Sequence, residues 1–289
     1  MTRGPRVWSV EDRGAPFVDV FKRSARRAGY EVCVITPKEE PPGFTLLRRH
    51  YRHLSPNPAR FELASFRRWF EIAAVVPPDE RVLVADSDIV VQGGFLELPE
   101  ELRDTASMVG SIGATDDVLE KGVSGGFSLW SGLQLRQFCD YVVSRYESGA
   151  DRLAELYEWT RKAGRSSPGV SDMTLLHDWV RDAGVPFVNS NRIIDGTYID
   201  HNFSMPGCLG ARFRTVIGLK ALRFTHDGFW LLTREGNPVR PICLHLVGRC
   251  KILARDIEGG NQARLAMKSL YILGGRMFRR QIGRLSPRT

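Results

Sequence analysis

The stretch RVLVADSDIVVQGGF, residues 81–95, decides the fold that we expect for this 289-residue chain. Arg81 to Ala85 is a continuous apolar run, which is typical of a strand buried on both faces of a sheet. It leads directly into Asp86-Ser87-Asp88, and a second apolar run follows before Gly93 and Gly94 turn the chain. Because ligands of open α/β sheets bind at the carboxyl ends of the strands, we expect this acidic triplet at the binding edge.

The segments around this strand predict an α/β fold. An apolar strand at residues 7–10 is followed by a helix that Gly29 closes and by a second strand at residues 32–35. Strand, helix and strand at this spacing open a parallel α/β sheet. The cluster Pro41-Pro42-Gly43 predicts an irregular stretch, and Asn57-Pro58 predicts the start of the next helix. Downstream we expect a strand at 107–112, a Gly-rich segment at 124–127, helices over 133–163 and 172–183, and a last strand at 242–246.

The composition describes an ordinary globular protein, with 43% hydrophobic and 26% charged residues. We find no internal repeat and no long linker, so we expect one domain over residues 1–260 and a basic extension over 261–289. No stretch approaches the ~20 apolar residues that cross a bilayer, and the first residues lack the apolar core of a signal peptide, so a cytoplasmic location is expected. The five cysteines include no CxxC pair, which argues against a disulfide framework or a cysteine zinc site.

The net charge of +8 resides in the C-terminal extension. Residues 264–289 hold seven of the 41 Lys and Arg and no acid, which leaves 34 basic against 33 acidic residues elsewhere. Because the body is nearly neutral and carries no recognition motif, nucleic-acid binding is not expected.

The acidic triplet admits three interpretations. Two carboxylates at positions i and i+2 can bind one hard cation, and that cation can neutralise a departing diphosphate. Asp-Ser is also ordinary turn chemistry, so a solvated turn is the simplest alternative. Finally, D-x-D followed by a hydrophobic residue and Val fits haloacid-dehalogenase-type phosphatases, in which Asp86 would be the nucleophile. Such an enzyme also needs a second acidic pair downstream, and Asp116-Asp117 follow too soon to supply it. A nucleotidyltransferase is the other class on a similar sheet, but the chain lacks a Gly-rich N-terminal phosphate loop.

A second motif, His-x-x-Gly-x-x-Lys, follows the last predicted strand. His245 is a suitable third metal ligand, Gly248 permits close approach of the backbone to a phosphate, and Lys251 supplies a point charge for a diphosphate. Together with the acidic triplet, this motif predicts a metal and diphosphate site.

These motifs, in this order, resemble a known family. Phe66-Arg67-Arg68-Trp69, the stretch at 81–95, Ser124-Gly125-Gly126, Val170-Ser171-Asp172 and the motif at 245–251 are similar to those of retaining glycosyltransferases of the glycogenin and lipopolysaccharide-galactosyltransferase type. The resemblance spans roughly residues 60–251. It implies a Rossmann-like mixed sheet of the A-type glycosyltransferase fold, a nucleoside-diphosphate sugar donor (commonly a UDP-sugar), Mn²⁺ or Mg²⁺, and a role in cell-surface polysaccharide synthesis.

The resemblance also implies a role for each matching residue. The implied site consists of Asp86, Asp88 and His245 for the metal; Ser9, Asp12, Ser87, Gly248 and Lys251 for the nucleotide and diphosphate; Arg68, Ser124, Gly125, Gly126 and Ser171 for the donor sugar; and Asp172 as the catalytic residue. Asp172 would stabilise the oxocarbenium-like sugar or orient the acceptor hydroxyl, and both roles stay open. The chain departs from the family at Ser124, where Asn is usual, and at Val170 and Ser171, which replace Asp and Gln. The sugar and the configuration of the product therefore stay open.

The C-terminal extension predicts an amphipathic helix. Ala266, Leu270, Leu273 and Met277 recur at helical spacing with Lys and Arg between them. Such a helix can lie on an anionic membrane surface, which would suit a lipid-linked acceptor on the inner face of a membrane. The alternative is a helix packed on the body of the protein with a basic end.

Overall fold

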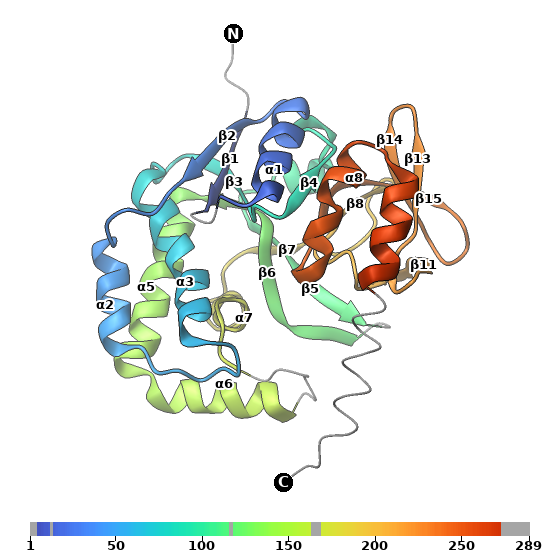
Figure 1. Ribbon diagram of the computed structural model, residues 1–289. Coiled ribbons are helices and arrows are strands. Elements are labelled where there is room, and N and C mark those ends of the chain that lie inside the picture. The colour runs from blue at the N-terminus through green and yellow to red at the C-terminus, as the bar shows by residue number, and fades with distance from the viewer. Residues whose placement is uncertain (1–4, 12–13, 116–117, 163–168, 273–289) are drawn as a thin grey trace.

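The computed structural model of the chain describes residues 5–11, 14–115, 118–162 and 169–272 (Figure 1). The expected mixed α/β architecture is confirmed. In the described part of the chain, no helix is both long and apolar enough to pass through a bilayer.

The central sheet has six strands in the order β2-β1-β3-β6-β5-β7. The strands are β1 Arg6–Val10, β2 Glu31–Ile35, β3 Arg81–Ala85, β5 Met108–Thr115, β6 Val118–Ser131 and β7 Phe187–Asn189. β1 runs parallel to both β2 and β3, and β6 is antiparallel to both β3 and β5. The sheet is therefore mixed. Asp86 directly follows the carboxyl end of its apolar central strand β3.

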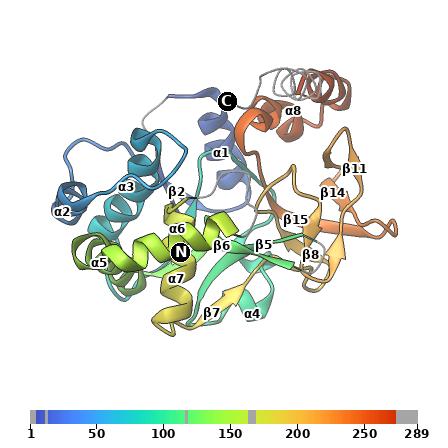
Figure 2. The same ribbon diagram turned by 90° about the horizontal axis from the view of Figure 1, so that it is seen from below.

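Helices pack against the strands of the protein (Figures 1 and 2). They are α1 Pro16–Arg27, α2 Pro42–His50, α3 Ala59–Val75, α4 Glu100–Arg103, α5 Gly132–Ser148, α6 Ala150–Lys162, α7 Asp172–Asp182 and α8 Ala254–Glu258, with 3₁₀ turns η1 Phe95–Glu97 and η2 Gly248–Leu253. Trp69 of α3, Trp130 of β6, Phe138 of α5 and Trp179 of α7 pack against one another with ring centroids 5.0–5.9 Å apart. This aromatic cluster fixes α3 and α7, which carry two of the predicted site residues.

A second sheet joins the first at the acidic triplet. It has the order β13-β14-β15-β4, with β8 beside β15, and its strands are β4 Ile89–Val91, β8 Thr197–Ile199, β13 Leu222–Thr225, β14 Gly228–Leu232 and β15 Pro238–His245. β15 runs antiparallel to β4 with His245 opposite Ile89. Two pairs of two-residue strands complete the set: β9 Gly207–Cys208 with β10 Ala211–Arg212, and β11 Thr215–Val216 with β12 Leu219–Lys220. The pairing of β4 with β15 brings the two sequence motifs together.

One expectation about local structure was wrong. The stretch after Pro41 is the helix α2, because Pro42 occupies a first-turn position where its missing N–H costs nothing. The helical stretch expected over 133–163 is confirmed for the residues that the structure describes, up to 162, and it is divided at Gly149 into α5 and α6. The Gly-rich segment at 124–127 lies within the strand β6, where Ser124 pairs with Ser111 of β5 and Phe127 pairs with Ala85 of β3.

Candidate metal and diphosphate site

The acidic triplet links the two sheets. Asp86 follows β3, and its N–H donates to the carbonyl of Gly126 at 2.7 Å. Asp88 precedes β4, and its carbonyl accepts from the N–H of Leu246 at 3.0 Å. Both carboxylates are thus fixed by backbone bonds to strands that meet from different parts of the chain.

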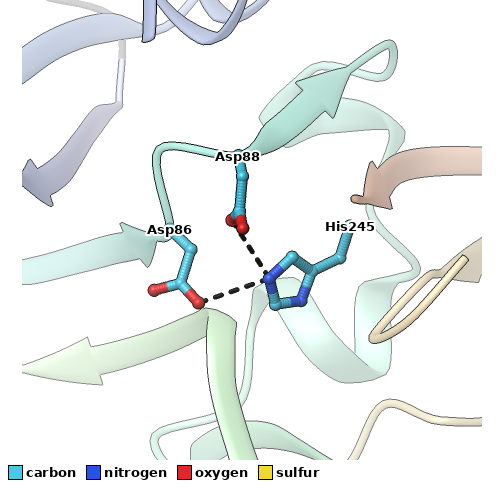
Figure 3. A group of neighbouring side chains, drawn as sticks. All are labelled: Asp86, Asp88 and His245. Carbon is cyan, nitrogen blue, oxygen red and sulfur yellow. Dashed lines mark ion pairs between the residues drawn. The ribbon is translucent and has the colours of Figure 1, made fainter. Parts of the chain in front are cut away.

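Asp86, Asp88 and His245 point toward one another (Figure 3). Nε2 of His245 lies 3.4 Å from Oδ2 of Asp86 and 3.2 Å from Oδ1 of Asp88, and the three candidate ligand atoms lie within 4.8 Å of one another. Nδ1 of His245 lies 2.8 Å from the carbonyl oxygen of His201, which can only accept, so Nδ1 carries a proton and Nε2 faces the carboxylates. Two carboxylates and one imidazole with this orientation fit a divalent cation such as Mn²⁺ or Mg²⁺.

The neighbouring charges shift the pKa values of His245, Asp86 and Asp88 in the direction that favours their charged forms. Burial lowers the pKa of His245, but its hydrogen bonds to Asp86 and Asp88 outweigh this effect and raise the pKa to about 10. Burial raises the pKa of Asp86, but the charge of Arg68 and the bond to His245 bring it below its ordinary value. The pKa of Asp88 is also lowered, since His245 and Lys251 outweigh its burial. A cation that binds here has to displace the proton on Nε2.

The motif Gly248 to Lys251 lies beside the carboxylates. Nζ of Lys251, in η2, is 2.9 Å from Oδ2 of Asp88 and 4.9 Å from the centre of the Phe17 ring. Gly248 has φ 62°, a conformation that favours glycine, and an added Cβ would meet no atom within 4 Å. The glycine is therefore needed for the backbone turn that presents Lys251, and the space in front of it is open.

Arg68 of α3 bridges the triplet and the predicted catalytic residue. Its guanidinium pairs with Oδ1 of Asp86 and, at 2.7 Å, with Oδ2 of Asp172. Asp172 is 6% exposed and also accepts from the indole N–H of Trp69 at 3.2 Å and from the N–H of Met173 at 2.9 Å. These bonds fix the carboxylate of Asp172 next to the metal-ligand candidates.

The Gly-rich segment of β6 passes close to the site. A Cβ on Gly126 would lie 2.7 Å from Cε1 of His245 and 3.1 Å from Oδ2 of Asp86, and one on Gly125 would collide with the ring of Trp69. The hydroxyl of Ser124 accepts from the N–H of Gly126 at 3.3 Å. Gly126 is therefore required by its close approach to the candidate ligands, and Gly125 by its close approach to Trp69.

Ser171 caps the helix that carries Asp172. Its hydroxyl accepts from the N–H of Thr174 at 3.4 Å and is partly exposed. Ser171 therefore lies next to the site because it directly precedes Asp172 in the chain.

Of the two nucleotide-binding residues predicted at the end of β1, the structure describes Ser9. Ser9 is 1% exposed, and its hydroxyl has no hydrogen-bond partner among the residues that the structure describes. Asp12 lies outside the described residues. Instead, Glu11, which is buried directly after β1, accepts from the hydroxyl of Ser87. Sequence analysis missed Glu11, although an acid directly after the first apolar strand was a usable signal.

Comparison with known proteins gives similarity in structure only. No protein-family model and no curated protein sequence matches the chain. The chain is similar to the solved structure of the galactosyltransferase LgtC in complex with donor and acceptor sugar analogues, with a TM-score of 0.45 and 15% identity over 91% of this chain and 95% of that one. It is also similar to the apo form of the glycosyltransferase GlyE from Streptococcus pneumoniae TIGR4, with a TM-score of 0.35 and 14% identity over 65% of this chain.

A third similar structure is the apo form of mouse xyloside xylosyltransferase 1, with a TM-score of 0.40 and 12% identity over 64% of this chain and 84% of that one. The chain spans about half the length of the GlyE chains that it matches, 46% and 48%. At these identities and TM-scores, the similarities say nothing about substrate or activity.

Proposed function

We propose that the chain is a metal-dependent glycosyltransferase that moves a sugar from a nucleoside-diphosphate sugar to a saccharide or lipid-linked acceptor. The observation that carries the proposal is the meeting of Asp86, Asp88 and His245 with the cation of Lys251 at one edge of the sheet. Mn²⁺ or Mg²⁺ bound by these ligands supplies positive charge to a diphosphate as it leaves. Departure of a diphosphate requires mainly that charged groups be held in fixed positions, and the candidate site contains such groups.

The diphosphate and nucleoside lie, in this proposal, along η2 and the end of β1. Lys251 donates from Nζ to an oxygen of the leaving diphosphate and so stabilises the charge that develops there. The open space over Gly248 lets the backbone approach a phosphate. We assign the nucleoside to the side of Ser87 and Glu11, and a UDP-sugar is the donor to test first.

The sugar lies, in this proposal, beside Asp172 at the start of α7. Arg68 and the indole of Trp69 hold the carboxylate of Asp172 in place, which suits a group that stabilises a cationic sugar or orients an acceptor hydroxyl. Ser124, Gly125, Gly126 and Ser171 border the same space. NMR of the anomeric proton in the product would decide between retention and inversion.

The phosphatase alternative gains no support among the described residues. An Asp86 nucleophile needs a free carboxylate oxygen. Here Oδ1 is paired with Arg68, and Oδ2 lies 3.4 Å from Nε2 of His245. These contacts support a role for the Asp86 carboxylate as a ligand rather than as a nucleophile.

Differential scanning fluorimetry with a panel of nucleotide sugars, each with and without Mn²⁺, tests the proposal. A ligand at a hundred times its Kd stabilises the folded protein by about 2.7 kcal/mol, which raises Tm by several degrees. We expect such a shift for one nucleotide class and only with metal. Equal Tm values across the whole panel would count against the proposal.

A single carboxylate substitution tests the metal site directly. Asp88→Ala removes one ligand and the partner of Lys251, so slow Mn²⁺-dependent hydrolysis of the donor should disappear. Asp227→Ala removes an exposed carboxylate at the β13–β14 hairpin and should leave hydrolysis unchanged. Hydrolysis that persists in Asp88→Ala would contradict the assignment.

We also propose that the C-terminal extension lies on an anionic membrane surface on its cytoplasmic side. Residues 262–272 are helical, and the buried side of this helix includes Ile272. The opposite side exposes Met267 (65%), Leu270 (57%) and Tyr271 (73%). This apolar side, followed in sequence by five arginines, supports membrane contact; the predicted positions Leu273 and Met277 lie outside the described residues.

Flotation with liposomes tests the membrane proposal. The chain should float with anionic vesicles, and Leu270→Gln together with Tyr271→Gln should reduce flotation without changing Tm. The same result with purely zwitterionic vesicles, or equal flotation of the variant, would refute it.

A further inference from the structure

A fully buried ion pair lies directly behind His245. Asp200 follows β8 and Lys220 ends β12, and both side chains are 0% exposed. Nζ of Lys220 pairs with Oδ1 of Asp200 and donates to the carbonyl of Asn202 at 2.9 Å. The rings of Tyr198 and Phe213 lie 5.2 and 5.3 Å from Nζ. The ammonium group is thus enclosed by the carboxylate, one carbonyl and two aromatic rings.

The segment that contains Asp200 holds His245 at three points. Oδ2 of Asp200 accepts from the backbone N–H of His245 at 3.1 Å. The carbonyl of His201 accepts from Nδ1 of the ring at 2.8 Å, and the N–H of Phe203 donates to the carbonyl of His245 at 2.9 Å. Backbone and ring of His245 are therefore both bound by residues 200–203.

Stability alone is a weak reason for such a pair. Removing two charges from water is costly, and a buried ion pair replaced by apolar residues of similar size often leaves stability unchanged or higher. The pair nevertheless does something that apolar residues cannot do. One oxygen of Asp200 is held by Lys220, so the other is fixed in direction and meets the N–H of His245.

We propose that Asp200 and Lys220 are positioning residues of the metal site. Lys220 orients the Asp200 carboxylate, and this carboxylate, with the His201 carbonyl on the same segment, sets the place of His245 so that Nε2 faces Asp86 and Asp88. The inference rests on the metal site of the proposed function. Outer partners of metal ligands typically contribute ten- to hundredfold in metal affinity.

Two matched double variants test this role with Mn²⁺ alone as the probe. Asp200→Asn with Lys220→Met removes both charges but keeps an oxygen that accepts from His245, and its amide N–H₂ can donate to the Asn202 carbonyl that Lys220 releases. Asp200→Leu with Lys220→Met removes both charges and the acceptor. The two variants carry the same charge and differ in the side chain that faces the N–H of His245 and the Asn202 carbonyl. Asp200→Ala in the same background is the second choice if leucine prevents folding.

The Kd for Mn²⁺ is measured by electron paramagnetic resonance on the full chain, together with Tm. We expect the asparagine variant to bind within about threefold of the wild type, and the leucine or alanine variant to bind ten- to hundredfold more weakly. Asp178→Asn, which removes the charge that pairs with Arg152 between helices, is the control for lost stability: it should lower Tm and leave the Kd for Mn²⁺ unchanged.

The outcomes separate the two proposals. If the wild type binds no Mn²⁺, the metal site itself is refuted and the inference falls with it. If the wild type binds and the variant without the acceptor binds equally well, the metal site stands and the positioning role is refuted. A Kd that rises in step with falling Tm in all variants, Asp178→Asn included, also refutes it.

Discussion

Replacing Gly126 by alanine should damage the metal site without unfolding the protein. The added Cβ would lie 2.7 Å from Cε1 and 3.0 Å from Nδ1 of His245 and 3.1 Å from Oδ2 of Asp86. Carbon atoms prefer separations of about 3.5–4.0 Å, so the ring has to move by nearly 1 Å. Its Nδ1 is tied to the His201 carbonyl, which resists this movement. Overpacking of this kind costs about 1–3 kcal/mol, and about 1.4 kcal/mol corresponds to a tenfold change in Kd.

We therefore expect Gly126→Ala to raise the Kd for Mn²⁺ about ten- to hundredfold in isothermal titration calorimetry. Gly110→Ala in β5 is the matched control, since its Cβ would meet Cε of Met108 and Cγ1 of Val123 at 3.0 Å, in the core of the same sheet. This control should lose stability and keep the wild-type Kd. A folded Gly126→Ala protein that binds Mn²⁺ as tightly as the wild type would show that His245 and Asp86 do not bind the ion.

Three further predictions concern pH, catalysis and stability. Because the pKa of His245 is raised from 6.5 to about 10, Mn²⁺ binding should release about one proton and tighten about tenfold per pH unit from about pH 6.5 to 9, as calorimetry in buffers of different ionisation enthalpy would show. In the metal-free protein the same shift gives stability that is complete below pH 6.5 and is lost as pH rises through about 10, so its Tm should fall over this range. Asp172→Asn should reduce donor turnover by about a hundredfold or more, while the Kd for Mn²⁺ stays within twofold. The reason is that Asp172 contacts Arg68 and Trp69 and none of the three candidate ligands. Equal losses in turnover and in Mn²⁺ affinity would mean a structural role. Ser171→Ala removes the cap of α7 and should cost about 1 kcal/mol in a urea titration, whereas an unchanged midpoint would rule out the cap.

The sequence predicted the parts of the site that belong to compact motifs. Asp86 and Asp88 follow an apolar strand, and the spacing of His245, Gly248 and Lys251 is fixed by a strand end and one turn. Local chemistry and strand order were enough to predict that these groups would meet.

The residues that sequence analysis missed act through contacts between distant segments. Lys220 resembles an ordinary surface lysine in a turn-rich segment, and only the fold encloses it beside Asp200. The role of Glu11 depends on the neighbouring strand that carries Ser87. α2 was missed for a different reason, because a first-turn proline was interpreted as a helix breaker.

The link between the two sheets at Asp86-Ser87-Asp88 also determines when, during synthesis, the site can exist. A chain that has left the ribosome as far as residue 235 contains both carboxylates, Arg68 and Asp172, but neither the imidazole nor the lysine of the later motif. The cation-binding centre is completed only when β15 pairs with β4. A chain that ends before His245 therefore lacks one of the three candidate ligands, although it already contains all four residues of the aromatic cluster.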